Sequence, residues 1–111
     1  MAEEEMKRLK GLRAFRKGAI TQDLKALGNL DEDQLSFHLL DQVISTIETN
    51  LKTAEDIDQA ICERLEESQQ ENLILASRKY LMDVNVQLAK YRSLRESLKN
   101  KECLPSNPLL W

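Results

Sequence analysis

Apolar residues recur in steps of three and four along two long stretches of this 111-residue chain. The first set is Leu40, Ile44, Ile47, Leu51, Ala54, Ile57, Ile61 and Leu65, with one irregular step near its end. The second set is Ile74, Ser77, Leu81, Val84, Leu88, Tyr91 and Leu98, with Arg95 in the remaining place. Such spacing lines one face of an α-helix, as in a coiled coil. Because neither stripe can be buried by its own helix, the pattern predicts two helices packed on each other.

The polar stretch 66–72, EESQQEN, separates the two stripes. It contains no glycine or proline, so one continuous rod is an alternative. We expect a turn instead, because the stripes can cover each other only if the chain doubles back, and short connections favour antiparallel neighbours. The prediction is an all-α, coiled-coil-like antiparallel hairpin of helices at about 33–66 and 71–101.

A shorter basic helix at about 5–27 is predicted to precede the hairpin and to pack along it. Its apolar face is formed by Met6, Leu9, Leu12, Ile20, Leu24 and Leu27. We expect Gly28 and Asn29 to end it, since both tolerate positive φ at a helix C-terminus, and Asp31 or Asp33 to cap the next helix. Residues 1–101 then form one three-helix domain, followed by the proline-containing tail 102–111.

Charge alternates by segment. Residues 7–25 hold seven bases and one acid, residues 31–67 eleven acids and two bases, and residues 71–102 seven bases and four acids. The net charge is only −3. An acidic middle helix between two basic neighbours predicts a bundle whose helices attract one another.

Arg13 and Arg16 fall inside the apolar stripe of the first helix, not on its opposite side. An arginine can lay its stem on apolar surface and extend its guanidinium to a neighbouring acid. We therefore expect both arginines to pair with carboxylates of the second helix. Lys7, Lys10 and Lys17 point elsewhere and are the remaining, weak candidates for phosphate contact.

No constellation typical of an enzyme is evident. The single histidine, His38, lies beside leucines, and Cys62 follows the stripe residue Ile61, so packing roles account for both. One histidine cannot complete a zinc site with the distant cysteines Cys62 and Cys103. We expect no catalytic activity and no cofactor or metal. Reduced cysteines indicate an intracellular (cytoplasmic or nuclear) protein, and no apolar run is long enough to span a membrane.

Further apolar residues lie beside the main stripes and predict an interface between copies. They are Phe37, Leu39, Val43, Leu73, Leu75, Met82 and Val86. The first helix is too short to cover all of them, so we expect a homo-oligomer, most simply a dimer. The C-terminal residues Leu109, Leu110 and Trp111 form a second candidate docking segment, either on the same chain or on another.

The pattern of Arg13, Arg16-Lys17-Gly18 and Ile20-Thr21, followed by the acidic run LKTAEDIDQAICERLEE and by Tyr80, resembles the N-terminal Gag-like region of Pao/Bel-type LTR retrotransposon polyproteins. The likeness covers residues 9–94. No zinc knuckle, protease or capsid-sized domain accompanies it, so nucleic-acid packaging does not carry over. The resemblance implies a role in assembly or oligomerisation upstream of a capsid.

Three functions are consistent with these features. The first is a helical self-association module, Gag-like or derived from a retroelement. The second is a coiled-coil adaptor that binds a protein partner through its hairpin or its tail. The third is nucleic-acid binding through the basic N-terminal helix, which the acidic middle helix and a pI of about 5.2 disfavour.

Overall fold

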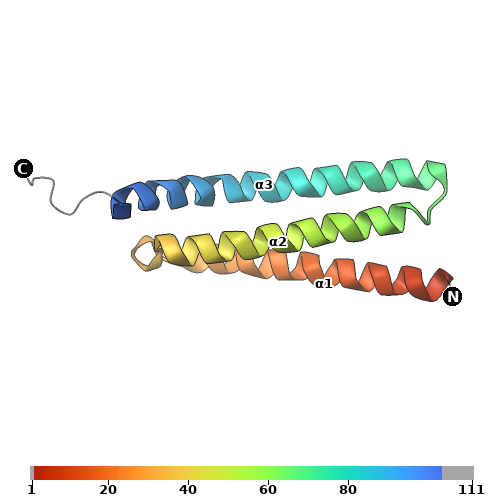
Figure 1. The fold of residues 1–111 in the computed structure, drawn as a ribbon, viewed down its shortest axis with the longest axis horizontal. Helices are drawn as coiled ribbons and strands as arrows, with labels where there is room; N and C mark the ends of the chain where they lie inside the picture. Colours follow the sequence, from red (N-terminus) through yellow and green to blue (C-terminus); the bar gives the residue numbers. More distant parts are fainter. Residues whose placement is uncertain (1, 104–111) are drawn as a thin grey trace, which may run out of the picture.

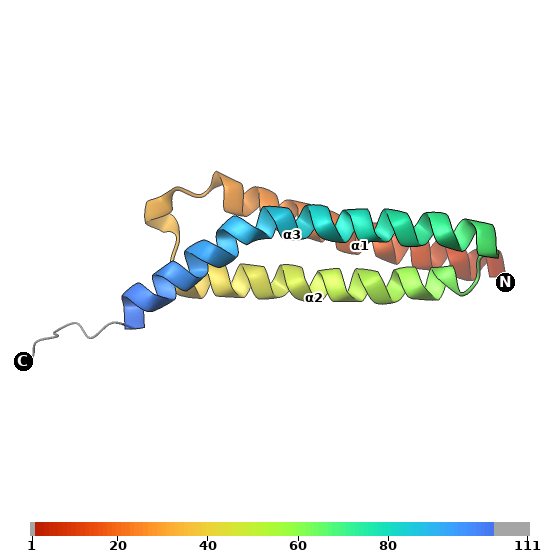
Figure 2. The same cartoon turned by 90° about the horizontal axis from the view of Figure 1, so that it is seen from above.

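The structure, a computed structural model, describes residues 2–103 and consists of three long α-helices and one short 3₁₀ helix. The helices are α1 (Ala2–Asn29), α2 (Phe37–Cys62) and α3 (Glu67–Cys103), and the 3₁₀ helix η1 spans Glu32–Gln34. α2 packs against both α1 and α3, and each consecutive pair of long helices is antiparallel (Figures 1 and 2). The predicted all-α three-helix arrangement is thus confirmed.

The first helix is longer than expected. α1 has 28 residues, against 26 in α2 and 37 in α3, so it is shorter than α3 only. It continues through Gly28 and Asn29, and no residue of the described chain has a positive φ. The left-handed helix end expected at these two residues was therefore wrong. Instead, α1 closes with a bond from the Leu30 N–H to the Leu27 carbonyl oxygen, at 3.3 Å.

The second helix begins later than predicted because η1 occupies residues 32–34. Ser36 is its N-cap: the hydroxyl oxygen accepts a hydrogen bond from the Leu39 N–H at 3.2 Å. A serine in extended conformation is among the preferred N-caps. Neither Asp31 nor Asp33 has that role. The Asp31 N–H instead donates to the Gln34 side-chain oxygen at 2.8 Å, which stabilises the connection.

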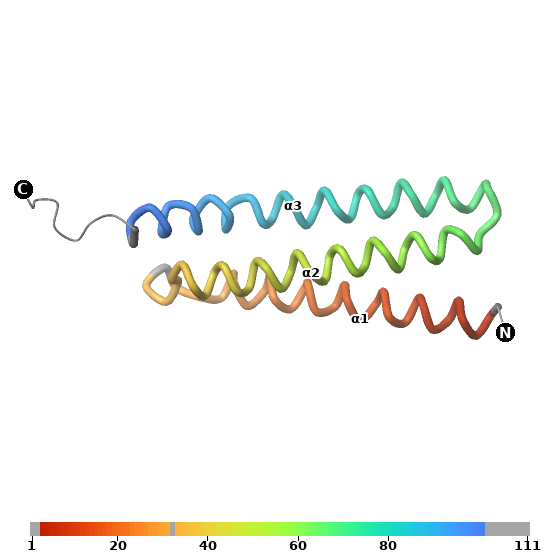
Figure 3. The backbone as a smooth tube through the Cα atoms, viewed as in Figure 1, coloured from red at the N-terminus to blue at the C-terminus, as the bar shows by residue number. Residues whose placement is uncertain are grey.

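The chain reverses between α2 and α3 at residues 63–66, earlier than the predicted turn (Figure 3). Most of the polar stretch 66–72 belongs to the first turns of α3, since its glutamates and glutamines are good helix formers. Gln70 holds the reversal together. Its side-chain amide donates to the carbonyl oxygens of Cys62, at the end of α2, at 2.8 Å and of Leu65, in the turn, at 3.1 Å.

The apolar core draws on all three helices. Its buried members are Ile20 and Leu27 of α1, Leu40, Ile44, Ile47 and Leu51 of α2, and Val84, Leu88 and Tyr91 of α3. The stripes predicted from the sequence supply most of this core. Toward the end of the bundle where α2 turns into α3, polar side chains take over stripe positions, and these define the candidate site.

Candidate interaction surface

Three side chains, one from each long helix, meet at Asp58. The Arg13 guanidinium donates to one carboxylate oxygen of Asp58 at 3.0 Å, and the Ser77 hydroxyl donates to the other at 3.0 Å. Asp58 is 7% exposed, so this carboxylate is withdrawn from water. A buried carboxylate is tolerated only when it is paired and hydrogen-bonded, and here both conditions are met. Arg13, Asp58 and Ser77 are called the polar layer below.

Asp58 occupies a stripe position of α2 that the sequence analysis assigned to Ile57. The buried residues of α2 include Ala54, Asp58 and Ile61, whose spacing continues the steps of four and three without irregularity. Ile57 is half-buried. A search for apolar residues alone selects Ile57 at this point, because Asp58, the residue that continues the buried stripe, is charged. The signal that could have found Asp58 is the unbroken repeat itself, together with Arg13 in the facing stripe.

The second stripe arginine, Arg16, does not meet a carboxylate. Its guanidinium donates to the side-chain oxygen of Asn50 at 2.9 Å, and Asn50 is 8% exposed. The structure thus places Arg13 against an acid of α2 but Arg16 against an amide. The difference follows from the spacing of residues along α2. The inward-facing residue one helical turn before Ala54 is Asn50, whereas the acids Glu48 and Glu55 face other directions.

The edges of the bundle carry ion pairs between helices of unlike charge. Arg92 and Arg95 of α3 reach Glu48 and Asp41 of α2 at 2.9 and 3.3 Å. At the opposite end of the bundle, Arg64 in the turn after α2 supplies the base and Glu5 of α1 the acid, at 2.9 Å. The two contacts of α3 thus join its basic residues to acids of the acidic helix α2, as the alternation of charge along the sequence predicts.

Lys17 differs from the other two lysines that the sequence offers as candidates for phosphate contact. It is half-buried, and its ammonium nitrogen lies 4.3 Å from the centre of the Tyr80 ring, where the ring face attracts a cation. Lys7 and Lys10 are exposed and border a shallow depression together with Glu3 and Met6. Two lysines beside a glutamate make a weaker phosphate site than the three lysines named from the sequence.

Tyr80 lies between α1 and α3. Its hydroxyl is buried and has no hydrogen-bond partner among the described residues, and burial raises its pKa above the usual 10.0. The ring lines a groove of about 410 Å³ with Ile20 and Leu24 of α1 and Val84 of α3. The ionised phenolate is disfavoured there because the groove removes it from water.

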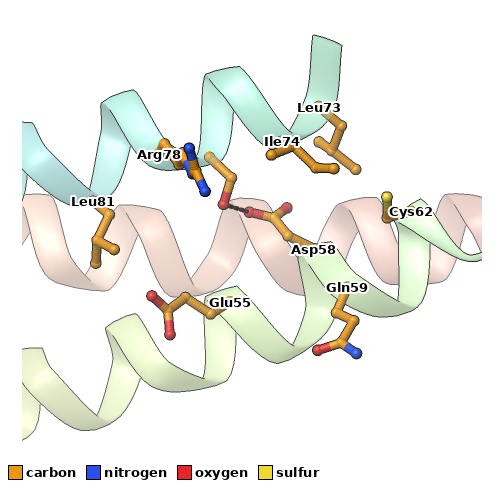
Figure 4. Close-up of a pocket in the computed structure, with 9 residues that line it drawn as sticks. Glu55, Asp58, Gln59, Cys62, Leu73, Ile74, Arg78 and Leu81 are labelled. Carbon is orange, nitrogen blue, oxygen red and sulfur yellow. Dashed lines mark hydrogen bonds between the residues drawn. The ribbon is translucent and has the colours of Figure 1, made fainter. Parts of the chain in front are cut away.

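A second pocket, of about 460 Å³, opens between α2 and α3 next to the polar layer (Figure 4). Leu73, Ile74 and Leu81 of α3 form its apolar side, and Cys62 lies at the end nearest the turn. Figure 4 shows the bond to Asp58 crossing from one helix to the other. Leu73, one of the predicted interface residues, is half-buried as part of this pocket.

The outer face of α3 carries an exposed apolar stripe. Leu75 is 59% exposed, Met82 66% and Val86 72%, and all three point away from α2 because they lie opposite the buried Val84 and Leu88 on the helix. These three residues are called the outer stripe. Met82 and Val86 belong to the interface predicted from the sequence, which stays a prediction.

The other predicted interface residues lie elsewhere. Val43 is half-buried and packs against the core, while the Phe37 ring is half-buried with its centroid 5.7 Å from that of His38. Both belong to α2, so they do not extend the outer stripe. Phe15 of α1, which the sequence analysis did not include in the interface, is 69% exposed. Leu109, Leu110 and Trp111 lie outside the described residues.

No group of three or more metal-ligating side chains occurs within residues 2–103, and no helix in that range is long and apolar enough to cross a membrane. Comparison with known proteins gives no match: no family model, no curated protein and no solved structure is similar to this chain.

Proposed function

We propose that this chain is a non-enzymatic helical self-association module and that two copies pair through the outer stripe of α3. The observation that supports the proposal is the exposure of Leu75, Met82 and Val86 on one helix face while the opposite face of that helix is buried. Large apolar side chains gathered on an exposed face are typical of protein–protein contacts.

The energetics favour a dimer that depends on concentration. Complete burial of six such side chains, three from each copy, contributes at most roughly 9–18 kcal/mol. Loss of translational and rotational freedom costs about 4–15 kcal/mol, so the two terms are of the same order. We therefore expect a dimer that dissociates on dilution.

The proposal agrees in kind with what the Gag-like resemblance of residues 9–94 implies, an assembly role upstream of a capsid. A retroelement origin belongs to the same proposal. The adaptor alternative has one feature of its own in its favour, the pocket between α2 and α3, whose apolar wall of Leu73, Ile74 and Leu81 could receive a side chain of a partner.

Molar mass measured by light scattering across a hundredfold range of concentration tests the proposal. We expect the mass to rise from one chain toward two, and the double variant Met82→Asp/Val86→Asp to stay at one. The matched control is Ser45→Asp/Thr49→Asp, which adds the same charge at exposed positions of α2 and should dimerise normally. A strict monomer throughout, with the Met82 and Val86 variants unchanged in mass, would contradict self-association.

A further inference from the structure

The groove that contains Tyr80 is lined by residues of α1 and α3 and is called the α1–α3 groove below. The helix pairs that pack closely are α1 with α2 and α2 with α3. α1 and α3 run in the same direction, since each is antiparallel to α2 (Figure 1). In a four-helix bundle each helix packs on two neighbours. The three helices thus occupy three corners of such a bundle, and the α1–α3 groove lies at the fourth.

The floor of the α1–α3 groove is apolar. Ile20 and Leu24 of α1 and Tyr80 and Val84 of α3 form it. Met6, at the depression near the start of α1, continues the same face of that helix, because it lies about five helical turns before Leu24. Apolar side chains therefore follow α1 for about 27 Å, which is enough to receive one face of a helix of about 18 residues.

Exposed lysines stand along both edges of this groove. They are Lys7, Lys10 and Lys25 on α1 and Lys79 and Lys90 on α3. Helical spacing places Lys79 and Lys90 on the same flank of α3 as Asp83, which lines the groove. Within residues 2–103, none of the five lysines forms an ion pair. The acids on these edges are Glu3 and Asp83, so the groove is basic although the chain has a net charge of −3.

We infer that the α1–α3 groove binds an acidic amphipathic helix of a partner protein. The apolar face of that helix would cover Leu24, Tyr80 and Val84, and the acids beside this face would meet the lysines on the two edges. An apolar groove with charged edges is a common receptor for an amphipathic helix, and the charge on its edges selects the partner. The groove is distinct from the outer stripe, so this binding does not depend on self-association.

A second copy of the chain fits the groove less well, although its α2 is acidic. Ser45, Thr49 and Lys52 lie on the outward face of α2, and this helix has no exposed large apolar side chain among the described residues. It therefore offers nothing to fill the apolar floor. RNA is also disfavoured, because Lys17 covers the Tyr80 ring at 4.3 Å and takes the place where a base would stack.

Selection from a peptide library tests the inference. The library displays peptides of about 18 residues with leucine in steps of three and four, and with glutamate, lysine or glutamine at the positions beside the leucines. We expect selection on the full chain to enrich glutamate on both sides of the leucine face. Enrichment of lysine at these positions, or of no peptide at all, would overturn the inference.

Charge reversal on α1 tests the place of binding. Lys10→Glu/Lys25→Glu should weaken binding of an enriched peptide about tenfold or more, as measured by fluorescence anisotropy. The matched control is Lys52→Glu/Lys99→Glu, which makes the same change of charge at exposed positions outside the groove and should change the Kd less than about twofold. Equal losses in the two variants would show a general attraction between charges and would contradict a site in the groove.

Filling the groove tests the same site without a change of charge. Thr21 and Gln87 are exposed and line the groove, so Thr21→Trp and Gln87→Trp should each weaken peptide binding at least about tenfold. Circular dichroism checks that both variants keep their helices. Full binding by both folded variants would overturn the inference.

Two further measurements identify the other occupants. Binding of a single-stranded RNA that Lys10→Glu/Lys25→Glu abolishes, with no peptide enriched, would assign the groove to nucleic acid and overturn the inference. Light scattering of Lys10→Glu/Lys25→Glu should give the same molar mass as the natural chain at every concentration. A lower mass in this variant would show that a second copy occupies the groove. Failure of self-association itself leaves the peptide measurements unchanged, so the two proposals are tested separately.

Discussion

Arg13 and Asp58 form a 3.0 Å ion pair in which the arginine side chain is 23% exposed and the aspartate side chain 9%. The pair joins the basic helix α1 to the acidic helix α2 at a place where both helices otherwise present apolar side chains. Its contribution to stability differs from that of the ion pairs at the edges of the bundle, because water screens it less.

Asp58→Ala should therefore lower the free energy of unfolding by about 2–4 kcal/mol, since it leaves the Arg13 guanidinium partly buried without a partner. Arg13→Ala should cost a similar amount, and the double variant less than the sum of the two. Urea unfolding measures all three. Asp56→Ala is the matched control, because the Lys52–Asp56 pair is largely exposed and should change stability by less than about 0.5 kcal/mol. Additive effects at Arg13 and Asp58 would show that the pair is not coupled.

The edge pairs should respond to salt. Exchanging Arg92 for alanine removes the contact with Glu48 and should cost about 0.5–1 kcal/mol at low ionic strength. In 1 M salt, where the Debye length is about 3 Å, we expect most of this difference to disappear. The Arg13→Ala effect should persist under the same conditions. Equal salt sensitivity of the two variants would contradict the distinction between the polar layer and the bundle edge.

Alanine at Gly11 and Gly18 should stabilise α1. A Cβ atom built at either glycine meets no atom within 4 Å, and both glycines lie inside the helix. Each exchange should raise the free energy of unfolding by about 0.5–1 kcal/mol, because glycine loses more backbone freedom than alanine on folding. Thermal unfolding followed by circular dichroism measures the gain, and the exposed Ala14→Gly provides the opposite control. A loss of stability in Gly18→Ala would show that this surface is covered in solution.

Tyr80 should make the bundle sensitive to alkaline pH. Because burial raises its pKa in the folded state, the unfolded chain releases the phenolic proton at a lower pH than the folded one. The stability that Tyr80 contributes is therefore fully present below pH 10 and decreases as the pH rises through its folded-state pKa. Tyr80→Phe should reduce this alkaline loss. It should also be neutral or stabilising at pH 7, because the buried hydroxyl has no partner among the described side chains. A Tyr80→Phe chain that loses stability above pH 10 as steeply as the natural one would contradict this account.

The fold was predictable because the apolar stripes recur over many helical turns, so that small errors in position do not change the overall answer. Helix ends were less predictable. The N-cap of α2 is Ser36 and not Asp31 or Asp33, because a 3₁₀ helix forms at residues 32–34. Nothing in the local composition indicates that helix.

The polar layer could be predicted only in part. Arg13 was recognisable as a base inside an apolar stripe, but Asp58 was hidden because isoleucine stands next to it at position 57 and fits an apolar pattern. Lys17 illustrates a different limit. Its placement on the Tyr80 ring depends on how α1 and α3 are spaced across α2, which is a property of the assembled bundle and not of either helix.

The polar layer has a consequence for how the helices find their alignment. Apolar stripes repeat every seven residues, so α1 could slide along α2 by two helical turns and still bury leucine and isoleucine against similar neighbours. After such a slide, Asp58 would face Met6 or Ile20 in place of Arg13, and a carboxylate would be enclosed by hydrocarbon. The single charged position among the apolar ones thus sets the register of α1 on α2. During folding, it makes the native alignment more stable than alignments shifted by seven residues.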